Sequence, residues 1–480
     1  DARGRGSRSL HCFAPASSNS IEFYEGDAAL TTMTARHKTL SLAVSLAVMA
    51  VLGGCAITPP PAPEEIRESA LQGTEIRAEW SAGQPAAGPI GDQWLRTFAD
   101  PRLDALVDEA ISRNPDLRAA AARVEQSAAY AEMARGALRP SLGLAGTATG
   151  NSSGASDFSS GMQGLMLAAS WELDLWGRLR YGRSAAEFSY ASAQADFEFA
   201  RQSLAAQVAR SWFIATEARL SLEAATSMAQ AARQLLQLAE DRQRVGIDKG
   251  RDVALASANL GTMEDMVRQA QQATEQASRS LELILGRYPA TELQAAEAFP
   301  ALPGPVPVGM PLDMLERRPD MVAAERRVAA AFDRVGEAKA AQLPRLTLNA
   351  GLGVLSSDVL EFKDDYENPA FGVGAGLLAP IYQGGQLKAQ VAVRTAEQAE
   401  ALARYASQAL TAIGDVENAL GTARLLAERI ELLTQTLADQ QRAFESDLAA
   451  YRAGRQDLRP VLQQQMQVQS ARMALLRVQS

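Results

Sequence analysis

The side chains most often used in catalysis and metal binding are scarce in this chain of 480 residues. Histidine occurs only at His11 and His37, and cysteine only at Cys12 and Cys55. Because the residues before Cys55 have the pattern of a removable leader, the mature chain keeps one cysteine and no histidine. That composition excludes histidine-based triads, histidine or cysteine metal sites and internal disulfides. An enzyme built on carboxylates alone is compatible with it, but no motif supports one. We expect no enzyme, no metal and no cofactor.

The remaining thiol, Cys55, has one chemical role that its context favours, which is to carry a lipid. Residues 36–38 are basic, and an apolar run follows over 40–52. That run suits a secretory leader and is too short for a transmembrane helix, which needs about 20 residues. It ends in Leu52-Gly53-Gly54-Cys55, which resembles a bacterial lipobox. We predict a lipoprotein signal peptide over 33–54 and palmitate on Cys55. An unmodified thiol beside an ordinary signal peptide is the alternative.

The segments on either side of this leader are interpreted from their composition. Residues 1–32 are patternless and precede Met33, so we interpret them as an over-read upstream of the true start. Residue 56 is Ala rather than Asp. In Gram-negative lipoproteins an Asp there marks retention in the inner membrane, so we expect sorting to the outer membrane. The prolines at 59–61 and 63 indicate an extended tether.

The charge balance argues against nucleic acid as a partner. The chain has 47 Lys+Arg against 56 Asp+Glu, a formal net charge of −9, and so lacks the basic footprint of a nucleic-acid-binding protein. Its hydrophobic share of 47% is too high for a disordered chain. We therefore expect a folded protein that does not bind nucleic acid.

The elements that must carry any function come in two copies. Asn114-Pro115-Asp116 recurs as Arg318-Pro319-Asp320, 204 residues later, and further on the offset becomes 208. We predict two structural repeats, 101–286 and 312–480, joined by a proline-rich linker over 287–311 that cannot form a continuous helix. The last helix of the second repeat is shorter than the matching helix of the first, so we expect the second repeat to be truncated at its C-terminus.

Each repeat predicts a helix, two strands and then two long helices. The first helices are expected at 116–138 and 320–342. The strands alternate apolar and polar residues, as over 165–176, which indicates one apolar and one polar face. The other expected strands cover about 139–148, 343–355 and 371–377, with polar loops at 149–162 and 356–369. Taken alone, the strands could also form the sheet of a soluble protein with one solvent-exposed face, and this remains an alternative interpretation.

The long helix over 178–245 makes that alternative less favourable. At about 1.5 Å per residue it is a rod of roughly 100 Å, which no compact domain needs. From Leu204 to Ala239, apolar and small residues recur along it at alternating spacings of four and three residues, which is the heptad seam of a coiled coil. The same seam recurs 208 residues later. Four strands cannot close a membrane barrel, and an open sheet edge cannot lie in lipid. Strands inserted in a membrane would therefore require oligomerisation.

Two further segments of the sequence, together with the lipobox, resemble those of a known family. The segment Arg317-Arg318-Pro319-Asp320-Met321-Val322-Ala323-Ala324-Glu325-Arg326-Arg327 is similar to the signature of the NodT-type, TolC-like outer membrane factors. So are Trp171-Glu172-Leu173-Asp174-Leu175-Trp176-Gly177-Arg178 and the lipobox. The resemblance implies a mainly α fold with a small antiparallel β part. In a homotrimer it implies a 12-stranded transmembrane β-barrel, with four strands from each chain, and an α-helical barrel in the periplasm. Residues 55–100 and the linker would form the anchor, tether and equatorial belt.

The family's function follows as an expectation. The resemblance implies a passive exit duct in the outer membrane that exports small molecules. Its partners would be outer membrane lipids, a periplasmic adaptor and an inner-membrane pump of the resistance-nodulation-division class. A duct for type I protein secretion and a periplasmic coiled-coil structural lipoprotein remain alternatives.

The resemblance also suggests gate residues at the periplasmic end. It implies a hydrogen bond between Asp252 and Tyr451, near the glycines at which each long helix turns, with Arg455 and Gln456 in the same network. The positions at which relatives carry a pore-lining acidic constriction match Pro460 and Gln463, so the acidic residue is absent at these positions. The alternative is that Asp252 only caps its helix and Tyr451 packs on the seam.

Overall fold

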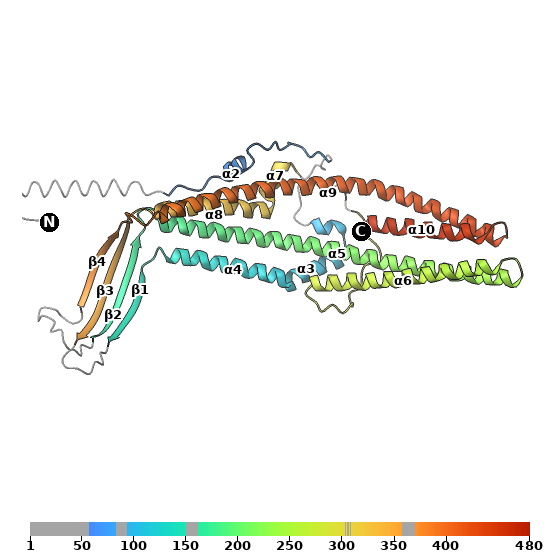
Figure 1. Ribbon diagram of the computed structural model, residues 1–480, viewed down its shortest axis with the longest axis horizontal. Coiled ribbons are helices and arrows are strands. Elements are labelled where there is room, and N and C mark those ends of the chain that lie inside the picture. The colour runs from blue at the N-terminus through green and yellow to red at the C-terminus, as the bar shows by residue number, and fades with distance from the viewer. Residues whose placement is uncertain are drawn as a thin grey trace, which may run out of the picture. The chain divides into compact units, whose positions relative to one another are not determined.

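The computed structural model in Figure 1 describes residues 57–82, 94–149, 162–302, 304, 307, 309–357 and 370–480. Residues Ile57–Ser480 form one compact unit. The predictions for 1–32, for the leader over 33–54 and for Cys55, and most of the two expected loops, lie outside the described residues. Among the described helices, none combines the length and the apolar character that crossing a lipid bilayer would require.

The described elements follow the duplicated order that the sequence predicts, with one further helix that was not predicted, α3 or α7, at the start of each copy. Ahead of the repeats lie α2 (Pro63–Ala70) and the 3-10 helix η1 (Trp94–Phe98). The first copy contains α3 (Pro101–Arg113), α4 (Pro115–Gly136), β1 (Ser141–Thr149), β2 (Met162–Leu173), α5 (Arg178–Arg244) and α6 (Gly250–Ile284). The second contains α7 (Pro311–Arg317), α8 (Pro319–Ala340), β3 (Arg345–Ser357), β4 (Ala370–Leu378), α9 (Gln386–Arg452) and α10 (Leu458–Gln479).

Short sequence signals set the starts of the helices. The carboxylate of Asp100 accepts hydrogen bonds from the backbone N–H groups of Arg102 and Leu103 at the start of α3, at 3.0 and 3.3 Å. Asn114 caps α4 in the same way. In both helices the residue after the cap is proline, whose missing N–H is not needed at that position.

The second strand ends earlier than the alternation predicts. We expected a strand over 165–176, but β2 ends at Leu173. The reason is Asp174, whose carboxylate accepts from the backbone N–H groups of Leu179 and Arg180 at 3.1 and 2.9 Å. That side chain caps the first turn of α5, since the residue directly before the helix is a glycine with a φ of 78°.

The four strands form one antiparallel sheet in the order β1-β2-β3-β4. Leu167 of β2 lies opposite Leu144 of β1 and Leu352 of β3, and Leu352 in turn lies opposite Phe371 of β4. This register brings the apolar residues of all four strands to one face, as predicted. Many of these side chains are exposed in the single chain, with Phe371 83% accessible. Among the described residues, the outer edges of β1 and β4 have no partner strand.

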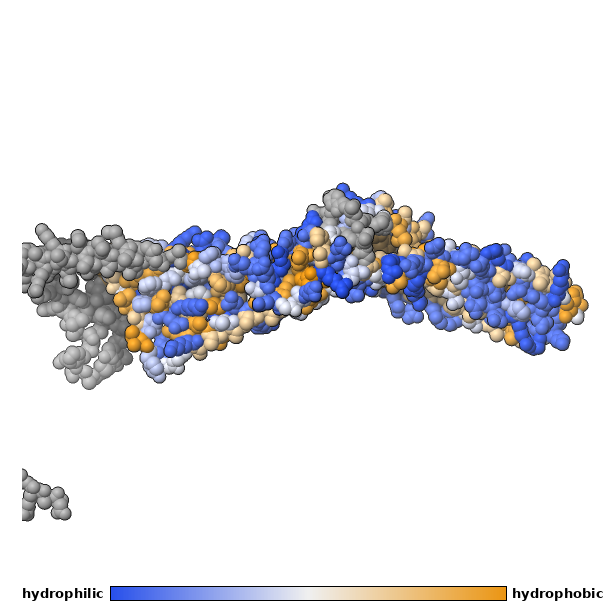
Figure 2. Space-filling view, turned by 90° about the horizontal axis from the view of Figure 1, so that it is seen from above, coloured by the Kyte–Doolittle hydropathy of each residue, from blue (hydrophilic) through white to orange (hydrophobic). Residues whose placement is uncertain are grey.

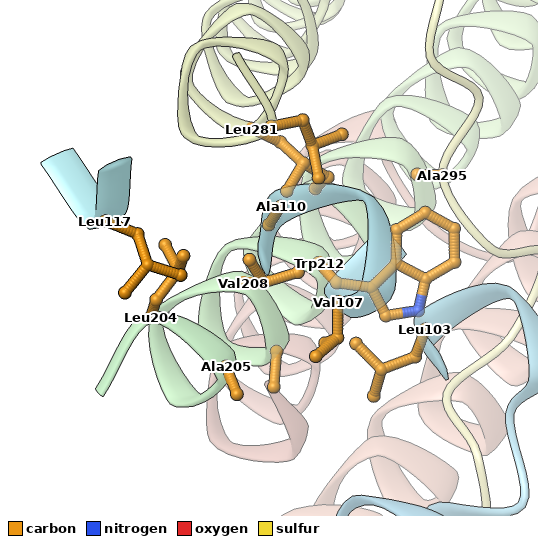
Figure 3. Packing of buried hydrophobic residues seen from close by; sticks show 13 residues of the cluster. Leu103, Val107, Ala110, Leu117, Leu204, Ala205, Val208, Trp212, Leu281 and Ala295 are labelled. Carbon is orange, nitrogen blue, oxygen red and sulfur yellow. The ribbon is translucent and has the colours of Figure 1, made fainter. Parts of the chain in front are cut away.

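Helix α5 is the central packing element. It contacts α6, α8, α4 and α3. Figure 3 shows the cluster where α3 meets α5, with Leu103 and Val107 packed near Val208 and Trp212. The indole N–H of Trp212 also donates to the carboxylate of Asp100 at 2.8 Å. The residue that caps α3 therefore also fixes that helix against the long rod.

The two predicted heptad seams differ in burial. On α5 most seam residues are buried, as predicted for a coiled-coil rod. On α9 the corresponding residues beyond Ala412 are only partly buried or exposed, and neighbouring large residues such as Leu425 and Leu432 are 50% and 67% exposed. Figure 2 shows that the surface over the long helices is mostly hydrophilic with separate hydrophobic areas. One chain thus leaves part of the seam of α9 uncovered.

Candidate functional site

The candidate site lies at the turns that end the two long hairpins, α5–α6 and α9–α10 (Figure 1). The turns are built alike. Gly246 and Gly454 adopt left-handed φ values of 78° and 74°, which an L side chain rarely tolerates. The backbone N–H of Gly246 donates to the backbone carbonyl of Gln243, and that of Gly454 to the backbone carbonyl of Tyr451, both at 2.9 Å. These bonds close the last turns of α5 and α9. This construction brings side chains from the end of α5, its turn and the end of α9 together.

Three of these side chains form a network that we call the tip network: Arg242, Asp248 and Tyr451. The Nε atom of Arg242 donates to Asp248 Oδ2 at 2.9 Å, and the phenol of Tyr451 donates to the same carboxylate oxygen. Arg242 Nη1 also donates to the backbone carbonyl of Tyr451 at 2.8 Å. The guanidinium carbon lies 4.6 Å from the centre of the Tyr451 ring, within the range of a cation–π contact.

Burial strengthens these contacts. Tyr451 is 1% exposed and Arg242 9%. Burial raises the pKa of the Tyr451 phenol, and its hydrogen bond to Asp248 raises it further. Burial alone would raise the pKa of Asp248, but the hydrogen bonds from Arg242 and Tyr451 outweigh it and hold that pKa below its usual value. At neutral pH the network is therefore a carboxylate held between a guanidinium and a neutral phenol.

The structure corrects the expected partner of Tyr451. The resemblance paired this phenol with Asp252, but the bond goes to Asp248. Asp252 lies at the third position of α6, accepts from the backbone N–H of Lys249 at 3.3 Å and contacts Arg251. Its helix position favours this local capping bond, as the alternative interpretation held.

The other predicted site residues make no described contact with the network. Gln456 donates to the backbone carbonyl of Asp447 at 2.8 Å. Arg455, Pro460 and Gln463 are exposed in the single chain. Cys55 lies outside the described residues. Their roles in gating, pore lining and lipidation stay predictions.

Sequence reasoning missed Arg242 and Asp248. At the repeat offset of 208 they correspond to Ala450 and Gln456, so the duplicated pattern gives no sign of the pair. The sequence does contain one signal, since Arg242 and Asp248 are six residues apart on either side of a glycine turn. That spacing does not predict that Tyr451 of the other hairpin completes the site.

Directly beyond the network, the two hairpins meet in an apolar cluster. Leu235, Ala239 and Ala256 of the first hairpin pack against Tyr451, Leu458 and Val461 of the second. The ring of Tyr451 thus belongs to the apolar seam while its hydroxyl belongs to the network. In the part of the chain that the structure describes, no cluster of three His, Cys, Asp or Glu residues is placed to hold a metal ion.

Comparisons with known proteins agree with this architecture. Residues 106–287 and 311–480 match the model of the family described as outer membrane efflux protein. The chain is 32% identical over 459 residues to the pyoverdine export outer membrane protein OpmQ of Pseudomonas aeruginosa, covering 92% of this chain and 93% of that one. It is 26% identical to the antibiotic efflux pump outer membrane protein ArpC of Pseudomonas putida, covering 90% and 91%.

Solved structures show the same fold. The outer-membrane channel OprN has a TM-score of 0.77 and 27% identity, with 88% of this chain and 95% of that chain covered. The open-state MtrE outer membrane channel of Neisseria gonorrhoeae has a TM-score of 0.72 and 24% identity, with 88% and 94% covered.

These findings define an outer membrane channel. The chain belongs to the outer membrane efflux protein family. It is the exit duct of a tripartite efflux system. The family consists of channels rather than enzymes, and its members assemble as homotrimers. Such an assembly would pair the open edges of β1 and β4, and the exposed apolar face of the sheet would then suit contact with lipid.

Proposed function

We propose that this chain is a lipid-anchored exit duct for small organic molecules, fed by a periplasmic adaptor and an inner-membrane pump of the resistance-nodulation-division class. We further propose that the tip network holds its periplasmic end closed until those partners engage. The observation that carries the gating role is the shared carboxylate of Asp248, which binds one group from each hairpin. A trimer would repeat this buried contact three times.

The class of exported molecule is inferred from relatives. The proteins that it resembles are named for export of pyoverdine and antibiotics. We therefore place small organic molecules ahead of secreted proteins as the cargo.

An export assay tests the proposal. Cells lacking the chromosomal copy should accumulate small organic pump substrates, and the wild-type chain should restore their efflux. Restored secretion of a protein with no effect on small molecules would favour the type I secretion alternative. A trimer that carries Cys55→Ser tests the anchor separately, because that variant should lose labelling by radioactive palmitate. Persistent labelling would contradict lipidation at Cys55.

A further inference from the structure

A second polar contact joins the two hairpins far from the tip network. Gln465 of α10 is completely buried in the single chain. Its side-chain Oε1 accepts from Asn259 Nδ2 of α6 at 2.9 Å, and its Nε2 donates to the backbone carbonyl of Met228 of α5 at 3.3 Å. One amide thus ties three helices together. We call these three groups the amide clasp.

The clasp lies between two apolar clusters of the seam. The cluster around Leu458 and Val461 lies on its tip side, and a second cluster that includes Met228, Met263 and Val468 packs around its level. Apolar contacts resist separation but have little directional preference, whereas hydrogen bonds fix the relative position of their partners. A single buried polar side chain in a coiled-coil seam is a known way to fix its register.

Neighbouring glutamines make different contacts. Gln464 donates to Gln440 of α9, within the second hairpin. Gln469 is buried one turn further along, and its Oε1 has no hydrogen-bond partner among the described residues. Of these three, only Gln465 bonds to both helices of the first hairpin. At the repeat offset its counterpart is Ser257, so the contact belongs to the second copy alone.

The position of the clasp limits how far the tip can open. Met228 lies fourteen residues before Arg242 on the continuous helix α5, or about 21 Å along its axis. While the clasp holds, only the segment of the second hairpin between it and the tip can swing away from the first. Releasing the tip network alone would therefore give a partial opening.

We propose that Gln465 is a second latch of the closed channel: its two side-chain hydrogen bonds, to Asn259 and to the backbone of Met228, must break before the two hairpins can separate fully. This inference rests on the proposed gating role of the tip. Because Gln465 is covered within one chain, its contacts do not depend on how neighbouring protomers are placed.

Single-channel conductance of purified trimers in planar bilayers tests the latch. Gln465→Met keeps the length and approximate volume of the side chain but removes both hydrogen bonds. We expect its fully open fraction to rise roughly fivefold over wild type, while the thermal unfolding of the trimer changes little. Gln464→Met is the matched control: it removes an amide contact within one hairpin and should conduct as wild type.

Two further variants separate the possible outcomes. Asn259→Ala should open the channel less than Gln465→Met, and the double variant no more than Gln465→Met alone, since both act on one contact. Wild-type conductance of Gln465→Met, alongside increased conductance of Tyr451→Phe, would overturn the latch and leave the tip gate in place. Increased conductance of Gln465→Met with no effect of Tyr451→Phe would support the latch and contradict the tip gate. An equal rise in Gln464→Met would also overturn the latch.

Discussion

Arg242 binds the backbone carbonyl oxygen of Tyr451 at 2.8 Å and lies over its ring, so the last turn of α5 holds the last turn of α9. The carbonyl contact survives any change to the Tyr451 side chain, whereas the bond to Asp248 requires the hydroxyl. The two contacts can therefore be separated by mutation.

Tyr451→Phe should increase single-channel conductance without unfolding the tip. The ring keeps its place in the apolar seam, but the hydrogen bond to the carboxylate, worth about 1.5–3 kcal/mol for a charged acceptor, is lost in each protomer. Asp248→Ala should increase conductance more, because it also leaves Arg242 without its ion-pair partner. Conductance is measured in planar bilayers, with trimer mass checked in detergent.

Asp252→Ala is the matched control for that series. It removes a nearby carboxylate that caps α6 and that makes no described hydrogen bond to Tyr451. We expect near-wild-type conductance. A rise as large as that of Asp248→Ala would restore Asp252 as the gate residue.

The tip should loosen in acid. The pKa of Asp248 is held below its ordinary value of 3.8, which means that its ionised form is bound more strongly in the closed state. That stabilisation is fully present above the ordinary pKa and is lost as the pH falls through the lowered one. Open probability should stay flat from neutral pH to about pH 4 and rise only below it. Asp248→Asn should lack this acid transition; an unchanged transition in that variant would assign it to another group.

The positions that replace the acidic constriction offer a gain-of-charge test. Gln463 is exposed in the single chain and Pro460 lies one turn before it. If Gln463 lines the pore, Gln463→Asp adds three carboxylates to the trimer and should shift the reversal potential in a salt gradient toward cations. The neutral variant Gln463→Asn should leave it unchanged. Identical reversal potentials for the two variants would place Gln463 away from the ion path.

Periodicity and proline positions were sufficient to predict the order from α4 and α8 onward, because the duplicated pattern runs through those helices, the strands and the long helices, but α3 and α7 were not predicted. The end of β2 was missed because Asp174 continues the alternation but is used as a helix cap. The tip network was missed for a different reason. Its partners come from non-equivalent positions of the two copies, and the register between two packed hairpins is set by tertiary packing rather than by either sequence pattern.

Asp333 of α8 is a second feature that the repeat conceals. The equivalent residue in the first copy, 204 positions earlier, is Ala129. Asp333 is completely buried, and neither carboxylate oxygen has a hydrogen-bond partner among the described residues. Burial raises its pKa, and the nearby Ser184 offsets only part of that rise. A buried carboxylate without a partner costs free energy of folding whenever it is ionised.

Asp333→Leu should therefore stabilise the protein. Leucine has a similar size and no group that needs a hydrogen bond, so we expect the free energy of unfolding to rise by about 1–3 kcal/mol at neutral pH. Thermal unfolding of the detergent-solubilised trimer, followed by circular dichroism, measures the change as a higher midpoint temperature.

The sign of the pH dependence of this gain in stability follows from the raised pKa of Asp333. Below the ordinary value of 3.8 the aspartate is protonated whether folded or unfolded, and its ionisation penalty is absent; the penalty grows as the pH rises above that value. The advantage of Asp333→Leu should accordingly shrink as the pH approaches 4, and an advantage that grew in acid would show that the carboxylate has an unrecognised partner.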